Sequence, residues 1–404
     1  MRPAPVLVFA LQLAAQDFMQ RGFIEMRLAG FPQAAVNDRG RLIASALLRY
    51  EATYKISSAW RLAGGVEART DSHHQTQRVW SLSWWDRERQ RPAFAVRRAS
   101  LTYERPGVTL ELGKQFIRWG KTDILNPTDR FAPRDFLAVV DNDFLAVTAA
   151  RLALGAQNNT LELVFAPALT PSRVPLLTQR WAPLPTWVEV RERQPQYPPG
   201  GQFGARWNHV GRGWEASLSL YEGYNHLPLY EVRPVSAGLP VRIEARRFYP
   251  KLRMYGADAA VPLGPVTVKG EAALFRSPAS QTDEYVLYVV QAERQAGEWL
   301  LVGGYAGQTI TRAQGPPGFA PDRGLAKAFL GRAAYTIDAN RSVAVEGAAR
   351  QNGKGLWVKI EYSQALAAHW RATAAFTLIR GDQADFLGQY RRNSHFLLAL
   401  RYSF

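Results

Sequence analysis

The sequence predicts an all-β fold: a single transmembrane, antiparallel, up-and-down β-barrel of about eighteen strands. From residue 22 onward, apolar and polar residues alternate with a period of two, as side chains do on the two faces of a strand. The alternating segments are about 10 to 14 residues long, which is long for a soluble strand and suits a tilted strand crossing a bilayer. The connections between segments are alternately short and long.

The strands can be placed one by one from this alternation. In one clear example, Leu356, Val358 and Ile360 alternate with Lys359 and Glu361. The full set covers residues 22–30, 41–54, 59–70, 93–105, 107–118, 143–156, 159–167, 201–210, 212–224, 248–261, 264–276, 283–295, 297–309, 326–337, 340–351, 354–366, 369–380 and 391–404. An error of one hairpin would leave about sixteen strands, which is again an even number.

The lengths of the connections predict which end of the barrel is external. Bacterial barrels have short turns on the periplasmic side and longer loops outside. The short turns fall at 55–58, 105–107, 156–159, 210–213, 262–265, 295–297, 338–340 and 367–369, and the longest loops are 71–92, 119–142, 168–200 and 225–247. An even strand count puts both termini on the periplasmic side. The proline-rich stretch 167–200 is interpreted as an external loop because alternating strands resume after it.

The composition agrees with a membrane barrel. No stretch approaches the roughly 18 to 20 apolar residues of a spanning helix, yet the chain holds 12 Trp and 16 Tyr, residues that favour membrane interfaces. The formal net charge is +16, but the Arg and Lys residues are scattered singly. We therefore expect no nucleic-acid partner.

The N-terminus resembles a secretory signal. Residues 1–15 combine one Arg, an apolar run and small residues at Ala14 and Ala15, which predicts cleavage before Gln16. The alternative is a first buried strand or helix. With cleavage, residues 16–404 form the barrel as one domain.

The last strand carries a second targeting signal. Its apolar face holds Phe396, Leu398, Leu400, Tyr402 and Phe404. This pattern resembles the signal by which the barrel-assembly machinery recognises outer-membrane proteins, and the physical basis is addition of an unpaired strand to an open sheet edge. The resemblance implies an outer-membrane location in a Gram-negative cell, with outer-membrane lipids and the assembly machinery as partners. The alternative is an ordinary final strand.

A further resemblance rests on the motifs at 113–123, 126–129 and 387–393. These 22 residues look similar to a family of proteobacterial-type barrels related to porins, alginate-export barrels and barrels associated with lipid exporters. The resemblance implies the barrel architecture and names no substrate. Because porins can be trimers, it leaves a homo-oligomer open.

The connection 119–142 is the candidate functional loop. It mixes charges with apolar residues such as Phe131 and Phe136, so we expect it to fold into the barrel and narrow the pore. The alternative is a packing element that only stabilises the wall. The charges expected to set a transverse field at this constriction are Arg118, Lys121, Asp123, Asp129, Arg130, Arg134 and Asp135.

Charged residues on the polar strand faces would be costly in a protein core but not beside water. The predicted lumen-lining residues are Arg27, Arg69, Glu111, Lys269, Glu346, Arg350, Lys359 and Arg401, with Glu25, Glu67, Glu215, Glu271 and Glu361 on the same faces. The excess of Arg predicts a mild preference for anions.

These observations predict an outer-membrane channel for passive diffusion or facilitated passage of small, anionic or polar solutes. The alternative is an accessory barrel for export of lipid or polysaccharide. An enzyme is not expected, since the chain lacks a GlyXaaSerXaaGly motif and its six His show no meaningful spacing. We expect no catalytic residue, cofactor or metal site, and the absence of Cys excludes thiolate ligands.

Overall fold

The computed structural model describes residues 17–404 except 186, 237, 239 and 316–318. The signal segment predicted at 1–15 lies outside the described residues. Among the described residues, no helix is long and apolar enough to cross a membrane.

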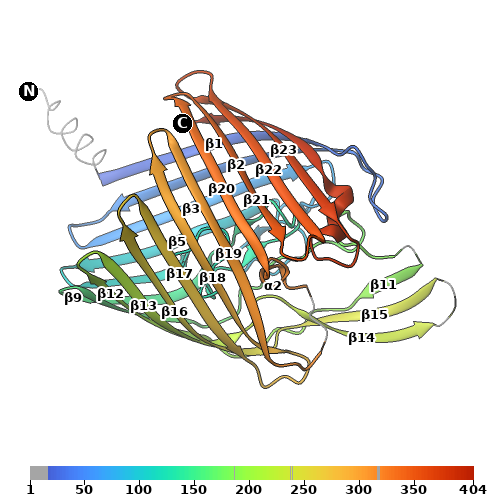
Figure 1. The fold of residues 1–404 in the computed structure, drawn as a ribbon, viewed down its shortest axis with the longest axis horizontal. Coiled ribbons are helices and arrows are strands. Elements are labelled where there is room, and N and C mark those ends of the chain that lie inside the picture. The colour runs from blue at the N-terminus through green and yellow to red at the C-terminus, as the bar shows by residue number, and fades with distance from the viewer. Residues whose placement is uncertain (1–16, 186, 237, 239, 316–318) are drawn as a thin grey trace, which may run out of the picture.

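The described residues form a closed antiparallel barrel of eighteen strands (Figure 1), as the sequence predicts. Each strand pairs with the next wall strand in the chain, and β24 pairs with β1 to close the barrel. The wall strands are β1 (Phe18–Gly30), β2 (Leu42–Lys55), β3 (Trp60–Asp71), β5 (Phe94–Arg105), β6 (Val108–Gln115), β9 (Val147–Ala156), β10 (Asn159–Ala166), β12 (Gln202–Gly211), β13 (Trp214–Tyr224), β16 (Lys251–Leu263), β17 (Val266–Arg276), β18 (Glu284–Ala296), β19 (Trp299–Arg312), β20 (Ala328–Asp338), β21 (Arg341–Arg350), β22 (Gly355–Ala365), β23 (Trp370–Gly381) and β24 (His395–Ser403).

The outer face of the wall is apolar, which fits burial in lipid. On β1, Ile24, Met26 and Leu28 are exposed, while Glu25 between them is buried inside the barrel. Trp299 on β19 packs against Tyr335 on β20 at the short-turn end, and Tyr305 packs against Phe329 on the same two strands nearer the other end. The two aromatic pairs are six residues apart on each strand, or about 20 Å along it, and they mark the edges of the apolar belt.

The predicted strand ends differ from the observed ones by at most four residues. One of these differences has a clear cause. The prediction begins a wall strand at residue 143, but β9 begins at Val147. Asp143 and Phe144 form the short strand β8 (Asp143–Phe144), which pairs with β7 (Arg134–Asp135) inside the preceding loop.

Two long connections contain a sheet that the alternation did not predict. β11 (Val188–Glu192), β14 (Leu229–Ser236) and β15 (Val241–Phe248) form a three-stranded sheet with β15 in the middle. Figure 1 shows it projecting beyond the long-loop end of the barrel. Two short helical segments, α2 (Pro321–Gly324) and η1 (Gly388–Asn393), lie in two of the other long connections.

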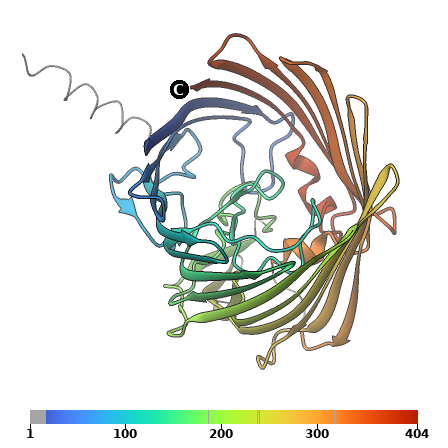
Figure 2. The same ribbon diagram turned by 90° about the vertical axis from the view of Figure 1, so that its left-hand side faces the viewer.

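The segment 116–146 leaves the wall after Gln115 and enters the barrel, where Figure 2 shows it surrounded by strands. Its departure leaves the first residues of β5 without β6 as a neighbour. The two-residue strand β4 (Leu82–Ser83) pairs with Phe94 and Ala95 there, and so completes the rim of the wall.

Candidate functional site

Glu271 on the far wall makes the most hydrogen bonds to the inward segment 116–146. Glu271 of β17 accepts hydrogen bonds from the backbone N–H groups of Lys121 (3.0 Å), Thr122 (3.4 Å) and Thr128 (2.7 Å). It also accepts from the hydroxyls of Thr122 (2.9 Å) and Thr128 (2.8 Å). At Gly120, φ is +88° and an added Cβ would lie 2.6 Å from a Glu271 oxygen. The segment therefore wraps around Glu271, and the wrapping needs glycine at position 120.

Two predicted constriction charges lie against the same wall. The ammonium group of Lys121 lies 2.9 Å from Glu215 and 3.7 Å from Asp258. Asp123 lies 3.4 Å from Lys269 and also accepts a hydrogen bond from Gln291. Both side chains thus help to hold the segment to β13, β16, β17 and β18.

Other predicted charges form contacts within the inward segment and with external loops. Asp129 is buried and accepts hydrogen bonds from the backbone N–H of Trp119 (3.0 Å) and from Arg118 (3.2 Å). The guanidinium groups of Arg118 and Arg134 lie over the ring of Phe144. Arg130 is buried beside Asn225 and Asp322.

Asp129 is expected to make the packing of the inward segment depend on pH. Burial raises the pKa of Asp129 to about 6, against the lowering effects of the Trp119 N–H and Arg118. Protonated Asp129 stabilises the packed segment. This contribution is complete below the ordinary pKa of the carboxyl near 3.8, and it is lost as the pH rises through about 6. We expect the packed segment to loosen between pH 4 and pH 7 and Asp129→Asn to remove this dependence, as measured by single-channel noise. An unchanged pH profile in Asp129→Asn would contradict the assignment.

Asp135 sits in a network that joins two external loops and the inward segment to the wall. It accepts hydrogen bonds from Arg91 (2.9 Å) and Arg173 (2.7 Å), and these two guanidinium groups hold its pKa below the usual range against the effect of burial. Arg173 also reaches Asp86 (3.3 Å), which pairs with buried Lys114 of β6 (2.6 Å). These charges are paired, and all of them except the partly exposed Arg91 are buried, so their first role is to fix the loops.

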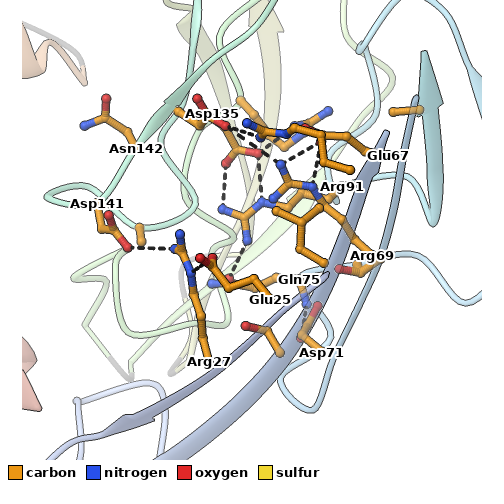
Figure 3. Close-up of a pocket in the computed structure, with 18 of the residues that line it drawn as sticks. Glu25, Arg27, Glu67, Arg69, Asp71, Gln75, Arg91, Asp135, Asp141 and Asn142 are labelled. Carbon is orange, nitrogen blue, oxygen red and sulfur yellow. Dashed lines mark hydrogen bonds and ion pairs between the residues drawn. The ribbon is translucent and has the colours of Figure 1, made fainter. Parts of the chain in front are cut away.

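A cavity of about 440 Å³ lies inside the barrel between the inward segment and strands β1, β2, β3, β5 and β24 (Figure 3). Two wall carboxylates lie beneath a layer of guanidinium groups. Glu67 is 6% exposed and accepts hydrogen bonds from Arg49 (2.6 Å), Arg69 (2.7 Å) and Arg97 (3.0 Å). The charged groups that the wall presents to the cavity are therefore largely guanidinium groups.

The other wall carboxylate, Glu25, is covered by arginines in a similar way. Glu25 is 5% exposed and pairs with Arg27 (2.5 Å) and Arg401 (2.6 Å). Arg27 and Arg401 are 40% and 38% exposed, so these two guanidinium groups are the most accessible of the wall cations that line the cavity. Figure 3 shows Arg27 between Glu25 and Asp141.

The inward segment presents carboxylates to this wall. Asp141 is 43% exposed and lies 3.4 Å from Arg27, and Asp143 is 45% exposed and lies 2.9 Å from Arg49. The whole lining carries seven guanidinium groups (Arg27, Arg49, Arg69, Arg91, Arg97, Arg173, Arg401) and seven carboxylates (Glu25, Glu67, Asp71, Asp86, Asp135, Asp141, Asp143). The charges balance in number. The most exposed cations lie on the wall and the most exposed anions on the segment, and the two sets meet in the Arg27–Asp141 and Arg49–Asp143 ion pairs.

The structure distributes the predicted residues over three regions. Arg27, Arg69, Arg401 and Asp135 meet in the cavity, while Lys121, Asp123 and Lys269 meet at the far wall. The remaining predicted lumen residues pair locally: Glu111 with Arg98, Glu346 with Arg332, Arg350 with Asp385 and Lys359 with Glu361.

The alternation missed Arg97, because β5 contains a bulge. The pairing of β3 with β5 shifts between Gly65 and Val66, so that Arg97 has no partner residue in the register. Arg97 and Arg98 both reach lumen carboxylates, Glu67 and Glu111. The two consecutive arginines were themselves a signal for this bulge in the sequence. Strict alternation would turn one of them towards lipid, at a cost of up to about 2–4 kcal/mol. A bulge avoids this cost.

The C-terminal residues lie on the closing seam. Phe396, Leu398 and Leu400 are exposed on the outer face, and the ring of Tyr402 packs against Trp370. The backbone N–H and C=O of Phe404 pair with the C=O and N–H of Gly22, both at 2.9 Å.

The geometry defines a class of protein. A closed barrel with an apolar outer face, a charged interior and long loops at one end is a transmembrane barrel of the outer-membrane type. Within the described ranges, no group of three or more His, Asp or Glu side chains is arranged to hold a metal ion.

Comparison with solved structures agrees with this class. The chain is similar to OccAB4 of Acinetobacter baumannii (TM-score 0.55, 10% identity, covering 96% of this chain and 98% of that one). It is also similar to a BenF-like porin from Pseudomonas fluorescens Pf-5 (0.55, 8%, 96% and 98%) and to Pseudomonas aeruginosa OpdK in complex with vanillate (0.51, 11%, 95% and 98%). The predicted porin-like outer-membrane fold is thus confirmed. No protein-family model and no curated protein sequence matches the chain.

Proposed function

We propose that this protein is an outer-membrane channel for passive diffusion or facilitated passage of small anionic or polar solutes, with the inward segment 116–146 as its constriction. The observation that carries the proposal is the guanidinium wall of the cavity. Arg27 and Arg401 are exposed to the lumen, whereas their partner Glu25 is buried beneath them. A solute carboxylate passing this wall would meet charged hydrogen-bond donors in a fork geometry that suits it.

The wall cations and the segment carboxylates set up an electric field across the constriction. Asp141 and Asp143 of the segment pair with the wall guanidinium groups of Arg27 and Arg49, so a passing anion competes with these carboxylates for the wall cations and is repelled by the segment. The complex of OpdK with vanillate, a small carboxylate, involves the same fold and supports this class of solute. The proposal needs no catalytic residue or cofactor. Its partners are outer-membrane lipids, the barrel-assembly machinery and small solutes, and a homo-oligomer is compatible with it.

A salt gradient across a planar bilayer tests the proposal. We expect an anion-selective reversal potential for the wild-type channel. Arg27→Gln and Arg401→Gln, measured separately so that Glu25 keeps one partner, should each lower the anion-to-cation permeability ratio about fivefold, since a unit charge about 4 Å from an anion in water contributes about 1 kcal/mol.

Arg294→Gln serves as the control for charge removal, because Arg294 is exposed near the short-turn end of β18, away from the cavity lining. A cation-selective reversal potential for the wild type would contradict the proposed anion preference. A folded protein that gives no conductance would refute the channel and favour the export-accessory alternative.

A further inference from the structure

The outer face of the barrel carries a group of cations at the long-loop end. Arg253 of β16 and Arg276 of β17 are direct cross-strand partners, and both are exposed. Each is bounded in sequence by a buried residue, Leu252 and Met254 for the first and Phe275 for the second. Arg253 and Arg276 therefore point away from the lumen, towards the membrane side of the wall.

The height of this pair follows from the aromatic residues around it. Tyr255 is the next outward residue on β16 after Arg253 in the direction of the short turns, and it is exposed. The cross-strand row that contains the pair runs from Phe165 and Phe203 through Glu222 to Arg253 and Arg276. The pair thus lies just beyond the apolar belt, at the level of the lipid headgroups of the external leaflet.

The charges at this place are only partly balanced. Arg253 lies 2.9 Å from Glu222, and both side chains are more than half exposed. Arg312 of β19 lies 2.7 Å from Glu284. Among the described residues, no carboxylate lies within 4.0 Å of the Lys251 or Arg276 charge. Like charges directly opposite each other on neighbouring strands destabilise a sheet, so an external anion would relieve the repulsion between Arg253 and Arg276 that Glu222 offsets only in part.

We propose that Arg253 and Arg276 bind a phosphate group on the headgroup of an outer-leaflet glycolipid. A phosphate placed between two guanidinium groups can accept charge-assisted hydrogen bonds from both. The acyl chains of the same lipid would lie against the apolar outer wall below, beside Tyr255 and Leu274. A free anion lacks this second contact. This site is on the lipid side of the wall and is independent of the lumen.

Native mass spectrometry of the whole barrel in detergent micelles tests this site with bis-phosphorylated lipid A as the probe. Because each surface cation contributes roughly fivefold to the binding of anionic lipid, we expect Arg253→Gln/Arg276→Gln to weaken lipid retention about 25-fold. Lipid A stripped of both phosphates should bind the wild type as weakly as lipid A binds the double variant. Arg276→Gln alone should weaken lipid retention about fivefold. Folding of each variant is checked by the heat-sensitive migration of the intact barrel.

Arg294→Gln is the matched control, since Arg294 is an exposed arginine on neighbouring β18, near its short-turn end. It should retain lipid A like the wild type. The proposal is overturned by equal retention in wild type and double variant, by an equal loss in Arg294→Gln, or by equally tight binding of the dephosphorylated lipid. Displacement of lipid A by millimolar inorganic phosphate would also overturn it, because the site would then be one for a free anion.

Discussion

Replacing Glu271 by alanine is expected to release the inward segment from the wall and to raise the channel conductance and its noise. The backbone N–H groups of Lys121, Thr122 and Thr128 would lose their common acceptor. Each buried donor left without a partner costs about 1–3 kcal/mol, so the packed segment should lose at least about 3 kcal/mol. Single-channel recording and protease cleavage within 116–146 measure the release.

Two further variants make this prediction specific. Glu271→Gln keeps one acceptor oxygen and should give an intermediate release. Glu346→Ala removes another carboxylate on the predicted lumen face, whose nearest cation, Arg332, is 3.9 Å away, and it should leave conductance unchanged. If Glu271→Ala conducts like the wild type, Glu271 does not anchor a constriction.

Deleting Phe404 is expected to reduce the amount of closed barrel in the membrane without changing transport by the barrels that do assemble. The deletion removes both backbone hydrogen bonds to Gly22 and the ring that lies against this glycine. At about 1 kcal/mol for each hydrogen bond, the closed seam should lose about 2 kcal/mol. The readout is the fraction of heat-modifiable, protease-resistant protein in the membrane.

The control for loss of an outer aromatic residue is Phe329→Ala. Phe329 is 58% exposed on the outer face of β20, a strand that is not part of the closing seam. The Phe329→Ala substitution should reduce assembly much less than deletion of Phe404 does. Normal assembly of the truncated protein would contradict both the seam and the interpretation of the last strand as an assembly signal.

The strands could be predicted from the sequence because the outer face must be apolar at every second residue to lie in lipid. The same rule placed Glu25, Arg27 and Arg401 inside the barrel. It does not apply to loops, which explains why the external sheet of β11, β14 and β15 and the pairing of β8 with β7 were missed. Arg97 was missed because a bulge breaks the period of two.

The partners of the predicted charges could not be read from the sequence. Glu271 was placed on the lumen face, but its contacts with Lys121 and Thr122 span 150 and 149 residues of chain. Such pairings depend on the path of the inward segment. That path in turn depends on Gly120 and on the network around Asp135, which the charge pattern alone did not indicate.

The central claim is that the guanidinium wall lines the path of the solute. The chain contains no Cys, so one introduced thiol reports on one position. Ser45 lines the cavity and is the cross-strand partner of Arg27. Ala44, its neighbour, is exposed on the opposite, outer face of β2 and provides the matched control.

The measurement is the rate at which charged methanethiosulfonate reagents block current through Ser45→Cys channels in a bilayer. We predict that the anionic sulfonate reagent blocks Ser45→Cys faster than the cationic ammonium reagent, because the cations of Arg27 and Arg401 attract it. Neither reagent should change the current through Ala44→Cys. Faster block of Ser45→Cys by the cationic reagent, or no block by either one, would contradict the account.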